Sequence, residues 1–221
     1  MRRIIVMNSK GGCGKTTIAT NLASYYAAQG RRTALFDYDS QHSSSHWLRL
    51  RPEARPGIHG VGAYERQVPG VTRSWQLRVP PETERVVIDT PASMDRSELT
   101  ERIRNIDTIL IPVLPSPIDT YAAADFVRDL LLVGKLRRQS TRVAIIPNRV
   151  RVNTRSFHAL NRFLEQLEIP AVAELRDTQA YVAATDQGLG IHELDGRQAQ
   201  RERSSWRHII DWLEDAPEAS Y

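Results

Sequence analysis

Two patterns of apolar residues alternate along the chain. Short, nearly continuous apolar runs are typical of buried strands, and they occur at 4–7, 33–37, 85–89, 107–112 and 143–147, with a shorter one at 171–175. Between these runs apolar residues recur every three or four positions. This spacing predicts helices at 18–29, around Trp47 and Leu48, from Asp119 to about Arg138, at 156–167, near 178–186 and at 197–214. The alternation predicts a doubly wound α/β fold, a mainly parallel sheet with helices on both faces.

Residues 51–84 interrupt this alternation. Proline and glycine recur throughout the stretch, which predicts turns and little regular structure. We expect only a short helix or strand near 61–67 and a small strand near 73–79. A chain of 221 residues with 41% hydrophobic content is long enough for one well-buried core, so we interpret residues 1–221 as a single domain with an irregular insertion at about 51–84.

Composition narrows the classes of protein further. Thirty Lys and Arg residues against 26 Asp and Glu give a net charge of +4, so any binding of a polyanion must come from local clusters of cations. Cys13 is the single cysteine, which excludes an intrachain disulfide and fits a reducing compartment. Only four apolar residues follow Arg2 and Arg3, too few for a signal peptide, and no run approaches the length of a membrane span. We therefore expect a cytoplasmic protein.

The segment 8–17, with the sequence NSKGGCGKTT, lies between the first predicted strand and the first predicted helix. Backbone N–H groups of such a loop and of the helix start converge on an anion. Glycines at 11, 12 and 14 allow the loop to curl, Lys15 supplies a cation for the β- and γ-phosphates, and the Thr16 hydroxyl is suited to Mg²⁺. A dinucleotide-binding fingerprint fits poorly because Thr17 stands where a third Gly or Ala is needed. A glycine-rich turn with two surface lysines is the structural alternative.

Acidic residues follow the next two long strands. Asp37 and Asp39 come at the end of the second strand, and Asp89 ends the third. Ligands of open parallel sheets bind at the carboxyl ends of the strands, so these carboxylates are expected near the phosphate loop. For Asp37 a loop-capping role and a direct role at magnesium are both open. His42 and His46 lie four residues apart, but with no third ligand nearby they are interpreted as solvated or capping residues.

The loop sequence K-G-G-x-G-K-T-T, with the additional Lys10, resembles the deviant Walker A signature of the ParA/MinD family of ATPases, and the chain is most similar to its small ParF-like partition members. Asp37–Gln41 resembles the D-x-D-P-Q segment of the family, with Ser40 in place of proline. Asp89 resembles the Walker B acid. Ile111–Asp119 is similar to the segment through which family members dimerise. The resemblance implies the P-loop NTPase fold of the deviant Walker A type.

The resemblance also implies cofactors and residue roles. The cofactors are ATP, its product ADP and Mg²⁺. The implied catalytic residues are Lys15, Asp39, which orients the attacking water, and Lys10, which reaches the nucleotide of the partner subunit. Magnesium is assigned to Thr16, Asp39 and Asp89. The nucleotide-binding residues are Gly11, Gly12, Cys13, Gly14, Lys15, Thr16, Thr17, Asn148 and Arg149. Hydrolysis is therefore expected to be slow and to need an ATP-bound homodimer.

The end of the chain separates possible branches of the family. It is acidic and contains Pro217, unlike the basic amphipathic helix of membrane-bound members, so no membrane partner is expected. Arginines upstream of it could contact DNA phosphates without reading bases, with an ordinary solvated face as the alternative. These candidates are Arg149, Arg151, Arg155, Arg197, Arg201, Arg203 and Arg207.

The family resemblance implies an ATPase that dimerises with ATP, binds non-specific double-stranded DNA and associates with the nucleoid. Such an ATPase would position or segregate a cargo through a ParB-like or cargo-specific adaptor protein. The cargo could be a plasmid, a chromosome or a large protein body such as a carboxysome. The alternative is a regulatory nucleotide switch that binds a protein partner without DNA.

Overall fold

A computed structural model describes residues 1–64, 72, 76–134, 141–167 and 169–215. In these residues six strands form one sheet in the order β3-β2-β4-β1-β5-β6, and every neighbouring pair is parallel. The strands are β1 (Arg2–Val6), β2 (Thr33–Asp37), β3 (His59–Gly62), β4 (Arg85–Asp89), β5 (Thr108–Val113) and β6 (Arg142–Pro147). The predicted parallel α/β architecture is therefore confirmed.

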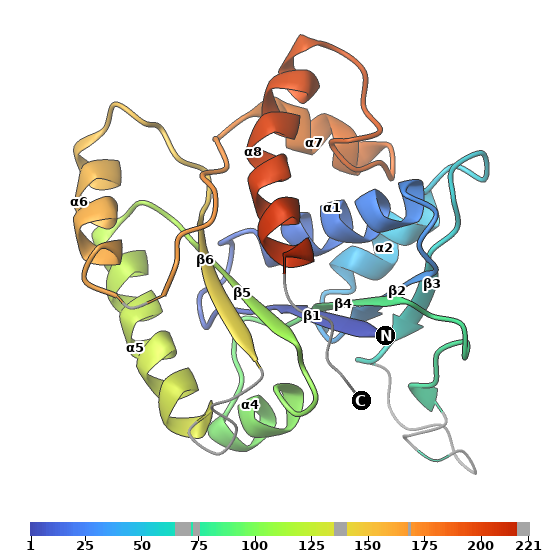
Figure 1. Ribbon diagram of the computed structural model, residues 1–221, viewed down its shortest axis with the longest axis horizontal. Coiled ribbons are helices and arrows are strands. Elements are labelled where there is room, and N and C mark those ends of the chain that lie inside the picture. Colours follow the sequence, from blue (N-terminus) through green and yellow to red (C-terminus); the bar gives the residue numbers. More distant parts are fainter. Residues whose placement is uncertain (65–71, 73–75, 135–140, 168, 216–221) are drawn as a thin grey trace.

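Helices cover both faces of the sheet (Figure 1). One face packs against α1 (Lys15–Ala28), α2 (Ser43–Leu50), α7 (Gln179–Asp186) and α8 (Arg197–Glu214). The other face packs against α4 (Arg96–Arg102), α5 (Pro117–Gly134) and α6 (Arg155–Leu164). Along β1, Ile4 and Val6 belong to the first core, whereas Ile5 belongs to the second. Alternate residues of a strand point to opposite faces, so an apolar run of this kind needs a cover on each side.

Several boundaries differ from the prediction. Residues 59–62 form β3, an edge strand beside β2, so part of the expected insertion belongs to the sheet. Helix α4 was not predicted: only Leu99 of its residues is buried, and it begins with a capping box between Asp95 and Glu98. The expected strand at 171–175 is reduced to isolated bridges at Ala171 and Arg176.

Other expectations fall partly on undescribed residues. The undescribed residues are 65–67 and 73–75 of the insertion and 135–138 of the helix predicted after Asp119. Of the small strand expected near 73–79, the described residues 76–79 do not form a strand. The single-domain organisation stays a prediction.

The carboxyl ends of the strands lie on one edge of the sheet. Val6 and Asp37 are both register partners of Asp89, so β1, β4 and β2 end side by side. β5 ends at Val113 beside Pro147, the last residue of β6. This edge therefore collects the phosphate loop, the acidic residues and Asn148, as the sequence predicted.

Candidate functional site

Two glycines of the loop between β1 and α1 adopt conformations that other residues rarely reach. Gly12 has φ 75°, and Gly14, the N-cap of α1, has φ 98°. A Cβ atom on Gly14 would also overlap the side chain of Asn148. Gly11, Gly12, Cys13 and Gly14 form the loop, and Lys15, Thr16 and Thr17 form the first turn of α1. The free N–H groups at this turn make the loop suited to an anion.

Two buried asparagines attach the loop to the sheet edge. Asn8 Nδ2 donates to Pro112 O at 2.7 Å, and Asn8 Oδ1 accepts from Lys10 N at 3.2 Å. Asn148 Nδ2 donates to Cys13 O at 2.7 Å. Asn8 was not selected from the sequence, although a polar residue directly after a buried strand was the available signal. The Asn148 amide nitrogen therefore holds the loop. The adenine contacts predicted for Asn148 and for the exposed Arg149 stay predictions.

The two lysines of the loop have different surroundings. Lys15 is buried, and its Nζ donates to Lys10 O at 3.0 Å. Lys10 is half-buried, and among the described residues no hydrogen bond or ion pair involves its Nζ. Burial raises the pKa of the neighbouring Cys13 thiol. This thiol is therefore an unreactive neutral group, as expected of a small tolerated residue.

Thr16 and Asp89 form the part of the site suited to magnesium. Thr16 Oγ1 donates to Asp89 Oδ2 at 2.8 Å. Asp89 Oδ1 is buried and accepts no hydrogen bond of normal geometry among the described residues, although the buried Ser44 hydroxyl lies close enough to favour the ionised carboxylate. Burial, and to a smaller extent the charge of Asp37, raises the pKa of Asp89 to about 7. A buried carboxylate oxygen without a normal hydrogen bond, beside a hydroxyl, fits Mg²⁺, which usually takes one or two protein ligands and completes its shell with phosphate and water oxygens.

Asp37 and Asp39 are held by local backbone hydrogen bonds. Both carboxylate oxygens of the buried Asp37 accept from backbone N–H groups, those of Asp39 at 3.1 Å and Ser45 at 2.8 Å. Of the two roles considered for Asp37, the structure favours capping of the loop and of α2. Asp39 is half-exposed, and its Oδ1 accepts from Gln41 N at 3.0 Å. Its roles at water and magnesium stay predictions.

The histidines near this segment do not assemble a metal site in the described part of the chain. His42 has φ 58° and packs against the Tyr64 ring with 3.7 Å between centroids. His46 is exposed and lies beside Arg49. His46 is therefore solvated, as the sequence favoured, whereas His42 stands at the N-cap of α2 without a side-chain capping hydrogen bond and packs on Tyr64.

The candidate DNA arginines fall into two groups, one around the start of α6 and one on α8, and these two helices line a common pocket that includes Val152, Asn161 and Arg201. Arg149, Arg151 and Arg155 lie between β6 and the start of α6, whereas the others are on α8 (Figure 1). Arg151 pairs with Asp177 at 2.7 Å. Arg203 is half-buried and donates to Leu194 O at 2.6 Å. The exposed side chains are those of Arg149, Arg151, Arg155, Arg197, Arg201 and Arg207. Arg203 therefore has a structural role that the sequence did not indicate.

Within the described residues, no helix has the length and apolar character needed to cross a membrane.

Comparison with known proteins agrees with the site geometry. A family model described as the CobQ/CobB/MinD/ParA nucleotide binding domain matches residues 4–191. The "Maintenance of carboxysome distribution protein A" of Gloeobacter kilaueensis is 31% identical over 217 residues, covering 96% of this chain and 94% of that protein. The protein of the same name from Halothiobacillus neapolitanus is 28% identical over 201 residues, covering 88% of each chain. The solved structure of Cyanthece apo McdA superposes with a TM-score of 0.71 at 16% identity, covering 95% of this chain and 99% of that one.

Proposed function

The chain belongs to the CobQ/CobB/MinD/ParA family of nucleotide-binding domains, and from this premise we propose that it is an ATP-dependent dimer that positions a large cargo on DNA. It is a P-loop ATPase of the ParA/MinD type. Of the relatives that match over most of their length, two are named for carboxysome distribution and a third is protein virC1 of Rhizobium rhizogenes, which is less similar at 27% identity. We therefore prefer a carboxysome, or a protein body of similar size, over a plasmid or chromosome as the cargo.

The observation that carries the ATPase chemistry is the buried Asp89 Oδ1 beside the Thr16 hydroxyl. Backbone N–H groups of the loop and the Lys15 ammonium would bind the phosphates, while Thr16 and Asp89 would hold Mg²⁺. When bound, Mg²⁺ neutralises charge on the phosphate oxygens. Asp39 orients a water that attacks the γ-phosphorus, the bond from that phosphorus to the β–γ bridging oxygen breaks, and ADP and phosphate leave.

Lys10 and the start of α5 support a dimeric active form. Lys10 Nζ has no partner in the described part of its own chain, so it is available to a second copy. Ile118 and Tyr121, in and beside the segment that resembles the family's dimer contact, are 71% and 74% exposed. Exposed apolar side chains of this size are typical of interaction surfaces. A lysine supplied in trans would stabilise the charge that develops on the phosphates.

DNA binding and an adaptor protein complete the proposal. Exposed arginines on two elements of each chain give a dimer at least two basic surfaces, which suits phosphate contacts without reading of bases. Nucleoid association follows from such binding. The alternative is a nucleotide switch that binds a protein partner without DNA. The presence or absence of DNA binding distinguishes the two.

The test compares wild type with Lys15→Ala, using Arg31→Ala as an exposed cationic control. We expect wild type and Arg31→Ala to hydrolyse ATP and to bind a random-sequence duplex with ATP but not with ADP, measured by fluorescence anisotropy. Lys15→Ala should bind neither ATP nor DNA. Hydrolysis without nucleotide-dependent DNA binding would support the switch instead.

For the cargo, deletion of the gene should cluster bodies that are marked by a fluorescent shell protein, and unchanged spacing would exclude that cargo.

A further inference from the structure

The loop between α7 and α8, residues 188–194, contacts α1, α2 and α8 on the same face of the sheet. Its hydrogen bond to α1 runs from Ile191 N to Asn21 Oδ1 at 2.6 Å. The loop follows Asp186, the last residue of α7, and leads to Arg197, the first residue of α8. Figure 1 shows α1, α2, α7 and α8 together on this face. Because α2 follows the Asp37–Gln41 segment and α8 carries candidate DNA arginines, the loop lies between the nucleotide site and a proposed DNA surface.

Helix α2 is fixed to the nucleotide site at one end and to the loop at the other. At its start, Ser45 N donates to the Asp37 carboxylate at 2.8 Å. In its middle, the buried Trp47 Nε1 donates to Leu189 O at 3.2 Å. A movement of the 37–41 segment on ATP binding would therefore act directly on the first turn of α2.

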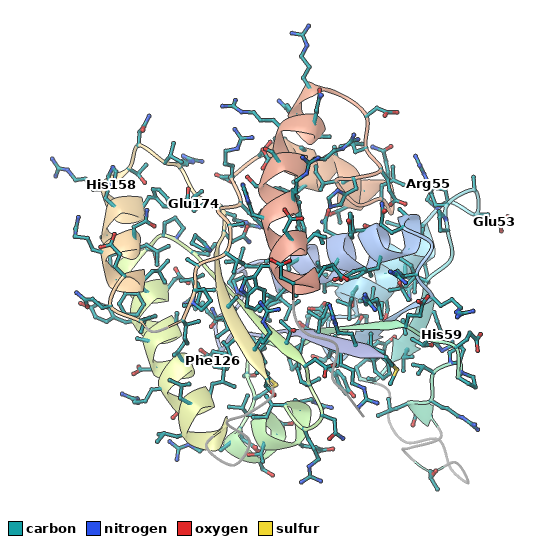
Figure 2. All side chains as sticks on the ribbon, viewed as in Figure 1. Glu53, Arg55, His59, Phe126, His158 and Glu174 are labelled. Atoms are coloured by element: carbon teal, nitrogen blue, oxygen red, sulfur yellow. The ribbon has the colours of Figure 1, made fainter. Side chains whose placement is uncertain are left out.

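A buried ion pair joins the end of α2 to the loop. Arg51 Nη2 and Nη1 donate to the two oxygens of Glu193 at 2.7 and 2.8 Å, and the side chains are only 4% and 3% exposed. Glu193 Oε2 also accepts from Gly190 N at 3.0 Å. Arg55, labelled in Figure 2, donates to Glu193 O at 3.2 Å. Separating the pair would leave two buried charges without partners, which is strongly unfavourable, so α2 and the loop should move together.

Close backbone packing reinforces this connection. Gly188 has φ 63°, and a Cβ atom there would overlap the backbone of Leu50 and Arg51. Arg51 Nη1 also donates to Gly188 O at 3.3 Å. No side chain separates the end of α2 from the loop at this point.

On its other side the loop is joined to α8. Arg203 donates to Ile191 O at 3.4 Å and to Leu194 O at 2.6 Å. The opposite end of α8 is attached elsewhere: Tyr26 Oη donates to Glu214 at 2.9 Å, and Arg142 donates to Trp212 O at 2.8 Å. A displaced loop would therefore act on the half of α8 that carries Arg197 and Arg201. That half is also held through Glu202, which accepts from Arg176 and from Tyr181 of α7, while the far end stays attached to α1 and β6.

From this arrangement we infer that the Arg51–Glu193 ion pair couples the nucleotide state to α8 and thereby makes DNA affinity depend on ATP. The inference rests on the proposed function, because it assigns the regulation of the proposed DNA surface. Arg51 and Glu193 contact neither the phosphate loop nor any of the candidate DNA arginines, so they act as positioning residues through α2 and the loop.

The first experiment measures amide hydrogen exchange of residues 188–203 and DNA affinity, each with ATP and with ADP. Coupled sites commonly change affinity by about 5- to 150-fold, and we expect wild type to fall in this range. In Arg51→Met the ratio should fall severalfold, towards the part that ATP-dependent dimerisation alone supplies, and exchange at 188–203 should no longer respond to ATP, while nucleotide binding is retained. Tyr26→Phe is the matched control, since it removes a buried contact of α8 that does not involve α2, and it should keep the wild-type ratio.

A second variant separates coupling from folding. Replacing a buried ion pair by apolar residues often preserves stability, so Arg51→Met with Glu193→Leu should fold even where the single change does not. We expect this double variant to show the same reduced ratio. Wild-type ATP dependence in either variant would overturn the inference, because the ion pair would then serve stability alone. If wild type itself binds no DNA, the proposed function fails, while the exchange response of 188–203 still tests the coupling.

Discussion

Asp89 is buried where its negative charge is unfavourable without a cation. Burial raises its pKa from 3.8 to about 7, so between these values the folded protein binds more protons than the unfolded chain. The contribution of Asp89 to folding stability is therefore greatest below pH 3.8 and decreases as pH rises towards 7. Magnesium binding requires the ionised form, so it should weaken as pH falls below about 7.

Asp89→Asn should raise the Tm of the magnesium-free protein at pH 8, because it removes the buried charge. For a domain of this size each 1 kcal/mol corresponds to roughly 2–4 °C, so an increase of a few degrees is expected. At pH 5.5 the increase should be much smaller, since the wild-type carboxyl is then mostly protonated. Thermal unfolding at both pH values measures this, and equal shifts would contradict the raised pKa. Magnesium-dependent hydrolysis should be lost.

Lys10→Ala should retain ATP binding but lose dimerisation and hydrolysis, because Lys10 holds the loop only through its backbone N and O, which alanine keeps, and not through its side chain. Cations supplied in trans in comparable sites contribute about 10³-fold or more to hydrolysis, so a loss of that order is expected. Calorimetry, light scattering and phosphate release measure the three properties. Normal turnover by the mutant would exclude a trans role for Lys10.

At the level of single elements, the start of α1 depends on the end of β6. Asn148 joins them through Cys13 O, and the close approach of its side chain to Gly14 leaves no space for a Cβ atom. The phosphate loop is therefore held in shape by a residue that is 135 positions away in the sequence. Its geometry should be sensitive to changes outside the glycine-rich segment.

Asn148→Ala should weaken ATP binding and lower the free energy of unfolding by about 1–3 kcal/mol, the usual cost of leaving a buried polar group without a partner. The exposed Asn153 provides the control, and Asn153→Ala should behave as wild type. Denaturant unfolding and ATP titration measure the two effects. If both variants bind ATP equally well, the loop does not need this support.

At the scale of the whole molecule, the exposed candidate DNA arginines of the described residues lie around the start of α6 and on α8, two helices that line a common pocket. A second copy would double the number of these arginines that can contact one duplex. If about six to eight phosphates are engaged, log affinity should fall against log salt with a slope of roughly −5 to −7. The slope therefore reports how many phosphates the ATP-bound dimer contacts.

Arg197→Glu combined with Arg201→Glu should weaken binding equally on all sequences and reduce that slope by roughly 4, since each copy loses two contacts. The control is Arg32→Glu combined with Arg104→Glu, which changes the net charge by the same amount. Both residues are exposed and lie before β2 and β5, at the opposite edge of the sheet from the nucleotide site. Arg203 is unsuitable for this test because it holds the 188–194 loop. Equal losses in both double variants would show that only total charge matters.

Patterns within short stretches were sufficient for much of this molecule. Apolar spacing predicted the parallel sheet and placed α8 at its observed bounds, because periodicity and burial are linked over a few residues. The phosphate loop was predicted for the same reason: its strand, glycines and helix are contiguous. Helix α4 was missed because a single buried residue leaves no periodic signal.

Contacts between distant residues required the folded chain. Arg201 and Arg203 look equivalent in sequence, yet one is exposed and the other binds loop carbonyl groups. Asn8 and Asn148 acquire their roles from carbonyl groups 104 and 135 positions away. Arg51 meets Glu193 across 142 positions. Local sequence carries no information about which charged or polar side chain will be buried opposite another, because that depends on how the helices and strands pack.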